Sequence, residues 1–195
     1  MARSYQLKRR AERQDQTRQK IIEAAIALHQ AKGLSATTMS DIAKHAKVGK
    51  VTVYRHFPDQ EALVGACSGQ YFKCHPFPDP EPWRSIPNPT EKLRRALQET
   101  YAYHSKTNAM MSRIHAEARD HRVMAPYHSH WQRIADILAA SWPLTGRKKE
   151  MLRAAFALAL GFETWRTLVV VQGLSIDAAA ELMLRLACDC PQVAD

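Results

Sequence analysis

Residues 37–57 read TTMSDIAKHAKVGKVTVYRHF, and this stretch decides the fold. The run Thr38-Met39-Ser40-Asp41 has the form of a capping box, so we expect a short helix to open at Thr37 or Thr38. A break near Lys47-Val48-Gly49 separates it from a second short helix, which ends at Phe57-Pro58-Asp59. Small and apolar residues supply a minimal core between the two helices, namely Ile42, Ala43, Ala46, Val48 and Val53. The stretch therefore predicts a helix-turn-helix.

The second helix of this pair has outward residues that suit the surface of DNA. Lys50 is cationic, and Thr52 and Tyr54 offer hydroxyls. Arg55 and His56 can meet phosphates or base edges. Because the major groove is wide enough to admit an α-helix, we expect this helix to lie in it.

Helical spacing recurs along the chain, and no convincing run of alternating apolar residues predicts a strand. A first helix is expected from Thr17 to Lys32, stopped by Gly33, because glycine permits the left-handed cap. Asp59 is expected to cap a fourth helix that runs to about Tyr71. The stretch from Cys74 to Pro89 contains six prolines and is interpreted as a loop.

The rest of the chain predicts further helices. One begins at Asn88-Pro89, and a separate short one holds Met110, Met111 and Ile114. An amphipathic one carries the apolar residues Trp131, Ile134, Ala135, Leu138 and Trp142. Pro126 is expected to start or kink the last of these. A single long helix is expected from Thr145 to Val171, and a final helix opens at Ser175. The predicted fold is all-α, with about nine helices.

The long helix is apolar on more than one side, so it needs a second partner. We expect the last two helices to form a symmetric four-helix interface in a homodimer. A central helix fully buried in a monomer is the alternative.

The charge of the chain is concentrated near its beginning. Residues 1–57 hold twelve lysines and arginines against four acids, whereas the remaining 138 residues hold sixteen against fifteen. Such a distribution suits binding to a polyanion, since a merely solvated surface would spread the charge evenly. The basic arm at residues 1–13 is expected to reach phosphates or a minor groove through Lys8, Arg9, Arg10 and Arg13, or to be a solvated terminus.

Several classes of protein are disfavoured. The sequence has no glycine-rich phosphate loop, no nucleophile elbow and no His-Glu-x-x-His, so we expect neither an enzyme nor a cofactor, although a catalytic Cys-His pair stays open. The longest apolar run, Ala154 to Phe162, is far shorter than the roughly 20 residues that span a bilayer. We expect no secretory signal, no membrane partner and a cytoplasmic location. Four cysteines are then expected to be reduced thiols, namely Cys67, Cys74, Cys188 and Cys190.

The segment from Thr37 to Leu63 resembles the TetR family of bacterial regulators. The resemblance rests on the threonine pair before Asp41-Ile42-Ala43, on residues 50–57 and on Pro58-Asp59-Gln60-Glu61-Ala62-Leu63. It covers residues 15–65 specifically, with a further family-like Phe162-Glu163-Thr164-Trp165. The chain departs from the family pattern at Lys47, where glycine is usual, at Gly49, where serine is common, and at Gln60, where lysine is common.

The resemblance implies a homodimer that binds a palindromic DNA operator, usually as a repressor, and leaves it when a small molecule binds. By similarity, the residues that contact DNA would be Thr38, Ser40, Gly49, Lys50, Val51, Thr52, Tyr54, Arg55 and His56. The domains would be the arm at 1–13, the helix-turn-helix domain with its linking helix at 14–74, and a ligand-binding and dimerisation domain at 75–195.

Aromatic residues and methionines in the C-terminal part are candidates for a ligand pocket, because such side chains line adaptable apolar sites. The candidates are Phe72, Tyr101, Tyr103, Met111, Ile114, His115, Trp131 and Trp165. Each is also a natural core residue, and the pattern favours an apolar or aromatic effector. A metal sensor built on His115, His121, His128 and His130, or on Cys188 and Cys190, is a minor alternative. A helical adaptor whose basic N-terminus binds RNA or a membrane surface is the competing hypothesis.

Overall fold

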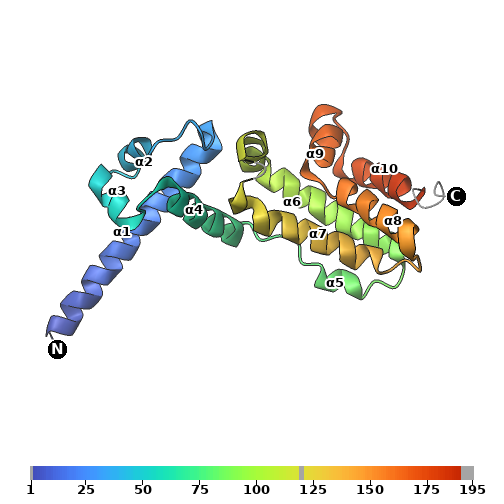
Figure 1. The fold of residues 1–195 in the computed structure, drawn as a ribbon, viewed down its shortest axis with the longest axis horizontal. Coiled ribbons are helices and arrows are strands. Elements are labelled where there is room, and N and C mark those ends of the chain that lie inside the picture. The colour runs from blue at the N-terminus through green and yellow to red at the C-terminus, as the bar shows by residue number, and fades with distance from the viewer. Residues whose placement is uncertain (1, 119–120, 190–195) are drawn as a thin grey trace. The chain divides into compact units, whose positions relative to one another are not determined.

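The structure is a computed structural model in which residues 2–118 and 121–189 are described. These residues form ten α-helices and no strand, so the predicted all-α class is confirmed (Figure 1). The chain divides into two compact units. The first comprises residues 1–76 and 112–123, and the second comprises residues 77–111 and 124–195.

The first unit is built on four helices, α1 (Ala2–Lys32), α2 (Met39–His45), α3 (Lys50–His56) and α4 (Gln60–Cys74). Their inward faces share one apolar core, in which Ile21, Ala25, Ile42, Val53 and Leu63 are at most 1% exposed. Gly33 ends α1 with φ +90°, a left-handed conformation that favours glycine.

The end of α6 (Pro89–Ala118) belongs to this first unit as well. The Glu117 carboxylate accepts hydrogen bonds from the backbone N–H and the hydroxyl of Ser35, at 2.9 and 2.8 Å. These donors hold the pKa of Glu117 below its usual range. Arg113 donates to the Ala31 carbonyl at 3.4 Å. The sequence-based boundaries at 14–74 and 75–195 assign this segment to the other domain.

The second unit holds the rest of α6 with five further helices. They are α5 (Glu81–Arg84), α7 (Ala125–Ala139), α8 (Gly146–Ala159), α9 (Phe162–Trp165) and α10 (Ile176–Asp189). A 3-10 turn, η1 (Arg122–Met124), precedes α7, and a π-helical segment, η2 (Arg166–Val171), follows α9.

Four sequence-based boundaries are wrong. Helix α1 begins near Ala2, well before Thr17, so the basic arm is helical. Met110 to Ile114 do not form a separate helix, because α6 runs unbroken to Ala118. The proline-rich loop contains α5, in which Trp83 is buried and its indole N–H donates to Glu99 at 2.9 Å. The fourth correction concerns residues 145–171.

The helix expected from Thr145 to Val171 is broken at Leu160 and Gly161. Gly161 has an extended conformation, with φ −66° and ψ 142°, and a Cβ there would lie 3.1 Å from the Leu158 carbonyl oxygen. Side chains of α6 bond the carbonyls at the break: the Tyr101 hydroxyl donates to Ala159 at 2.9 Å, and His104 Nε2 lies 2.9 Å from the Leu160 oxygen. Donors from elsewhere in the fold thus meet the carbonyls that a helix end leaves unpaired.

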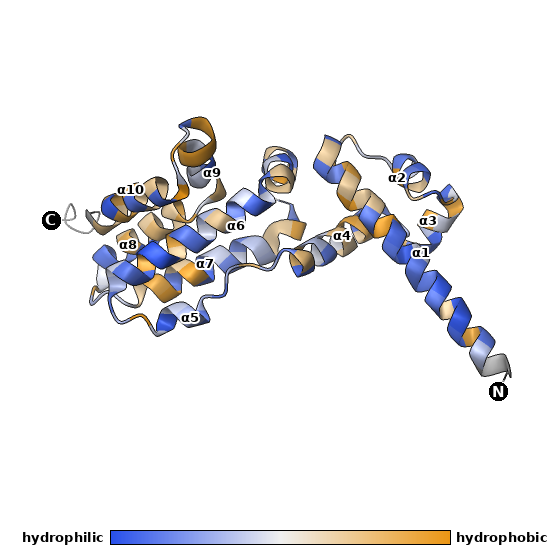
Figure 2. Ribbon diagram, turned by 180° about the vertical axis from the view of Figure 1, so that it is seen from behind, coloured by the Kyte–Doolittle hydropathy of each residue, from blue (hydrophilic) through white to orange (hydrophobic). Residues whose placement is uncertain are grey.

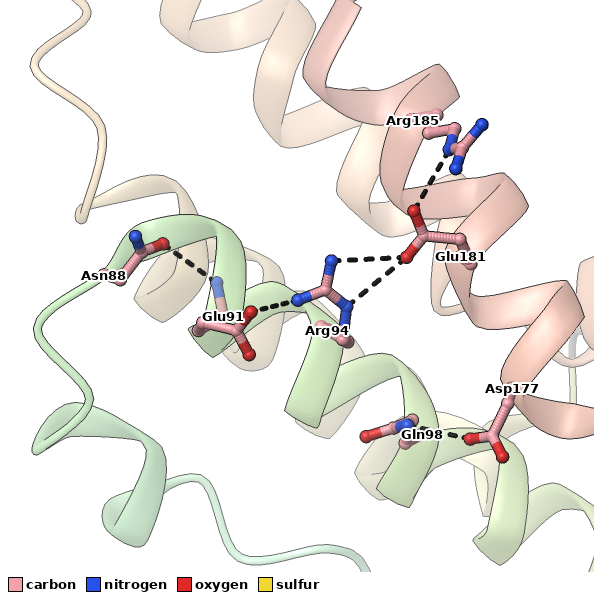
Figure 3. Close-up of polar contacts among 7 residues, drawn as sticks. All are labelled: Asn88, Glu91, Arg94, Gln98, Asp177, Glu181 and Arg185. Carbon is pink, nitrogen blue, oxygen red and sulfur yellow. Dashed lines mark hydrogen bonds and ion pairs between the residues drawn. The ribbon is translucent and has the colours of Figure 1, made fainter.

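Polar contacts join α10 to α6 (Figure 3). Arg94 binds Glu181 at 3.3 Å, and Gln98 donates to Asp177 at 2.8 Å. Because these contacts fix one side of α10 against α6, the side that carries Leu182 and Leu186 is left exposed.

No single helix in the described ranges is long and apolar enough to cross a membrane. Helix α8 and the segment Phe162–Val171 have the length and apolar composition of a membrane span only when taken together, and this pair is bent by 56°. Figure 2 shows the strongly hydrophobic colouring around α9 and the hydrophilic N-terminal part of α1.

Candidate nucleic-acid interface

Helix α2 is fixed at its start by the predicted capping box. The Thr38 hydroxyl accepts from the Asp41 N–H at 3.1 Å, and the Asp41 carboxylate accepts from the Thr38 N–H at 3.0 Å. Lys32 forms an ion pair with the same carboxylate at 2.8 Å. Bonds from Lys32 and Thr38 hold the pKa of Asp41 well below its usual range. Thr38 and Ser40 are exposed at this end of the helix.

The turn between α2 and α3 has a left-handed residue at the position where the family resemblance expects glycine. Lys47 has φ +55°, in the left-handed region that side chains disfavour. The Val48 N–H donates to the Ala43 carbonyl at 3.0 Å, which closes the turn. Gly49 then caps α3 through its backbone alone.

Helix α3 has one buried face and one exposed face. Val53 is 0% exposed and anchors the helix in the core, followed by Phe57 at 2%. On the opposite face Val51 is 66% exposed and Tyr54 is 43% exposed. The Lys50 ammonium lies 6.0 Å from the centre of the Tyr54 ring. A side chain as apolar as Val51, held this far out of the core, is available to a partner.

The structure brings the predicted DNA-contacting residues together on α3 and at the start of α2. Lys50, Val51, Tyr54 and Arg55 are exposed, whereas Thr52 and His56 are half-buried on the side of α3 that faces α1. Sequence reasoning missed Arg18, whose guanidinium lies 5.0 Å from the centre of the Phe57 ring. The signal was its spacing of eight residues from Arg10, two four-residue steps, which places both arginines on one face of α1.

The predicted ligand residues are divided between the two units. Phe72, Ile114 and His115 lie in the first unit, and the other five lie in the second. There Tyr103, Trp131 and Trp165 surround the buried His104, with ring centres 5.8, 5.0 and 5.8 Å from it. Tyr101 and Met111 are also buried.

Other members of this aromatic cluster were not among the sequence candidates, namely Phe77, His104, Tyr127, His130 and Phe162. Phe77 stacks on His130 with their ring centres 4.3 Å apart. Burial lowers the pKa of His130 to about 4, with a further contribution from Arg133. The cluster is therefore a mainly apolar interior in which His130 is neutral near pH 7.

No group of three or more His, Cys, Asp or Glu side chains among the described residues is arranged to hold a metal ion. Cys67 is buried, and burial raises the pKa of its thiol to about 12. Cys190, one of the two cysteines considered for sensing, lies outside the described residues.

Comparison with known proteins bears on the helix-turn-helix. Residues 21–67 match the family model for bacterial regulatory proteins of the tetR family. A Bacillus subtilis (strain 168) protein, the uncharacterized HTH-type transcriptional regulator YvkB, is 38% identical over 55 residues. That match covers 28% of this chain and 29% of the relative, so the chain is matched to less than a third of the relative's length.

Solved structures match nearly the whole fold. A TetR-like transcriptional regulator from Rhodococcus sp. RHA1 aligns with a TM-score of 0.60 at 22% identity, over 89% of this chain and 94% of its own. RolR in complex with its ligand resorcinol aligns with a TM-score of 0.53 at 19% identity, over 95% of this chain and 96% of the RolR chain. At these identities the likeness concerns the fold alone.

Proposed function

We propose, from the match of residues 21–67 to the tetR family model, that the chain is a TetR-family regulator and acts as a ligand-responsive transcriptional repressor in the cytoplasm. It binds a palindromic operator as a homodimer and leaves the operator when a small molecule binds. The observation that carries this proposal is the exposed face of α3, with Val51, Tyr54 and Lys50 held outward by the buried Val53. The family consists of regulators and not of enzymes.

The residues of the two helices divide between two kinds of DNA contact. Lys50, Tyr54, Arg55 and His56 carry donors that reach phosphates and fix the position of the protein. Val51 and Thr52 meet base edges, where an apolar contact or a hydroxyl distinguishes bases. Thr38 and Ser40 approach phosphates from the start of α2, and the exposed Gly49 lets the backbone come close.

The homodimer forms through α8 and α10. An apolar groove of about 420 Å³ lies between them, lined by Met151, Ala154, Ala155, Leu158, Met183, Leu186 and Ala187. Leu158 and Leu186 are 65% and 57% exposed. Two exposed leucines beside an apolar groove favour a protein partner. A second copy of this chain would cover the exposed apolar surface of both helices at once.

The effector is an apolar or aromatic compound that enters the second unit. Five of the candidate residues, Tyr101, Tyr103, Met111, Trp131 and Trp165, belong to this unit. Aromatic rings with few polar groups bind such compounds. RolR, whose fold is similar, has been solved with resorcinol, an aromatic ligand. The candidates Phe72, Ile114 and His115 belong to the first unit, so we propose a lesser role for them.

A footprint on genomic fragments selected by the protein tests the proposal. We expect a protected pseudo-palindrome whose half-sites lie roughly 34–36 Å apart, one helical turn, or a multiple of it. Tyr54→Ala should weaken binding to every operator equally, whereas Val51→Ala should change the preference among operators. Protection without symmetry, or stronger binding to RNA or anionic vesicles than to duplex DNA, would favour the adaptor hypothesis instead.

A further inference from the structure

A basic groove lies beside α3 in the first unit. It has a volume of about 490 Å³ and runs between α3 and the N-terminal part of α1. Arg10, Arg13 and Arg18 line it from α1, and Arg55, His56 and Thr52 line it from α3. Water takes roughly 30 Å³ in the liquid, so the groove has room for a solvated group far larger than one water molecule.

The spacing of the α1 residues explains why they share this groove. Residues 10, 13, 14, 17 and 18 follow the three- and four-residue steps that bring side chains to one face of a helix. Lys8 and Arg9 belong to the same basic arm but do not line the groove. The arm therefore has two faces with the same kind of charge, of which only one is paired with α3.

The charge of the groove is not neutralised by the protein. Its lining includes four arginines and a single acid, Asp15. In the described part of the chain, no ion pair joins Arg10, Arg13, Arg18 or Arg55 to a carboxylate. Concentrated cations that lack internal partners attract an external anion, and arginine matches phosphate oxygens with two parallel hydrogen bonds.

We propose that this groove holds a stretch of the DNA sugar-phosphate backbone, clamped between α1 and α3. This inference rests on the proposed function and deepens it. Val51 and Tyr54 point away from the core on the exposed face of α3, whereas Thr52 and His56 are half-buried toward α1. The exposed face of α3, with Thr52 at its edge, thus contacts the major groove, and Arg55 and His56 on the flank bind phosphates together with α1 without regard to sequence.

The test compares two double variants of the full-length protein on the operator found by footprinting. R10Q/R13Q removes two charges from the groove, and the matched control K8Q/R9Q removes two charges from the same arm outside it. Each phosphate contact contributes about 0.9 to the slope of log affinity against log salt. We expect R10Q/R13Q to weaken binding about 10-fold or more and to lower that slope by about 1–2. If only the face of α1 that lines the groove holds the backbone, the control weakens binding less than about 3-fold, whereas equal phosphate contacts by Lys8 and Arg9 would give a loss as large as that of R10Q/R13Q.

A double-mutant cycle then tests whether the two helices share one phosphate segment. R13Q combined with R55Q should weaken binding by less than the product of the two single losses, because either change already disrupts the clamp. R9Q combined with R55Q should give the full product. Discrimination between the operator and a scrambled duplex should stay unchanged in R10Q/R13Q.

The outcomes separate this inference from the function on which it rests. Equal losses of affinity in R10Q/R13Q and K8Q/R9Q, or additive losses in both mutant cycles, would refute the proposal that the groove holds the DNA backbone. The proposed DNA-binding function would be unaffected. Failure of the unmodified protein to bind any duplex would overturn both. The substituted arginines are on the surface, and circular dichroism of each variant would verify that the helices are kept.

Discussion

Two residues in the first unit, Lys47 and His29, have local conformations or surroundings that are expected to lower the stability of the fold. Lys47 has a left-handed backbone although it is not a glycine, and the buried His29 has no hydrogen-bond partner for Nε2 among the described residues. The family resemblance marked Lys47 as a departure, because glycine is usual at this turn position. The sequence analysis did not predict the burial of His29, whose charged neighbour Glu117 lies far away in the sequence.

Lys47→Gly should stabilise the protein by roughly 0.5–1 kcal/mol, because glycine adopts a left-handed conformation without steric cost. Urea unfolding measures the change. Lys47→Ala is the matched control, since it removes the same side chain and charge but keeps a Cβ. If the glycine variant is no more stable than the alanine variant, backbone strain at this position is not significant.

His29 should make the protein less stable as the pH falls from about 6.5 to about 4. Burial lowers its pKa to about 4, and the opposing attraction of Glu117 is smaller. Between the two pKa values the unfolded chain binds a proton that the folded chain does not, so unfolding is favoured. The loss is at most about 3 kcal/mol, at 1.36 kcal/mol per unit of pKa.

His29→Leu should flatten that pH dependence in urea unfolding measured at several pH values. The exposed His45→Gln serves as the control and should leave it unchanged. His130 contributes in the same direction from the second unit, so the difference between His29→Leu and the unmodified protein isolates His29. An unchanged slope in His29→Leu would contradict the assignment.

At the scale of elements, helix starts were predictable and one long helix was not. Caps are local: Asp59 accepts from the Ala62 N–H at 2.7 Å, and Asn88 accepts from Glu91 at 3.0 Å, as the sequence suggested. The break at Gly161 depends instead on Tyr101 and His104, which lie more than fifty residues earlier. Apolar periodicity continues through the break, so the pattern alone favours one helix.

Tyr101→Phe should destabilise the second unit by about 1–2 kcal/mol, because the buried Ala159 carbonyl loses its donor while the ring remains. Thermal unfolding followed by circular dichroism measures the change. Tyr5→Phe, at a side chain that is 62% exposed, is the matched control and should have no effect. A loss as small as in the control would mean that the helix break does not need this bond.

At the scale of the whole molecule, the distribution of charge and apolar surface was readable from the sequence. The excess of cations in residues 1–57 predicts a polyanion-binding end, and the apolar surface of the last helices predicts an interface; both stay predictions. The aromatic cluster was only partly predictable. His104 and Phe77 enter it through the packing of α6 and the loop before α5, which no local pattern specifies.

Leu158→Glu should raise the dissociation constant of the proposed homodimer by about 100-fold, because a carboxylate without a partner would be buried in an apolar interface. Sedimentation equilibrium measures the change. Leu7→Glu, on a side chain of α1 that is 61% exposed, is the control and should leave the dimer intact. A monomeric unmodified protein would instead refute the interface on α8 and α10.

The path of α6 through both units determines where the chain can be truncated without losing contacts of the first unit. One of the boundaries between the two units falls between Met111 and Ser112, inside one continuous helix, and residues 112–123 belong with the first unit. A fragment that stops at Pro76 would lose the bonds that Glu117 and Arg113 make to Ser35 and Ala31. It would also lose the ion pair between Arg122 and Glu61. Truncation at the proline-rich loop therefore yields an incomplete module, and limited proteolysis there should release a product less resistant to further cleavage than the intact chain.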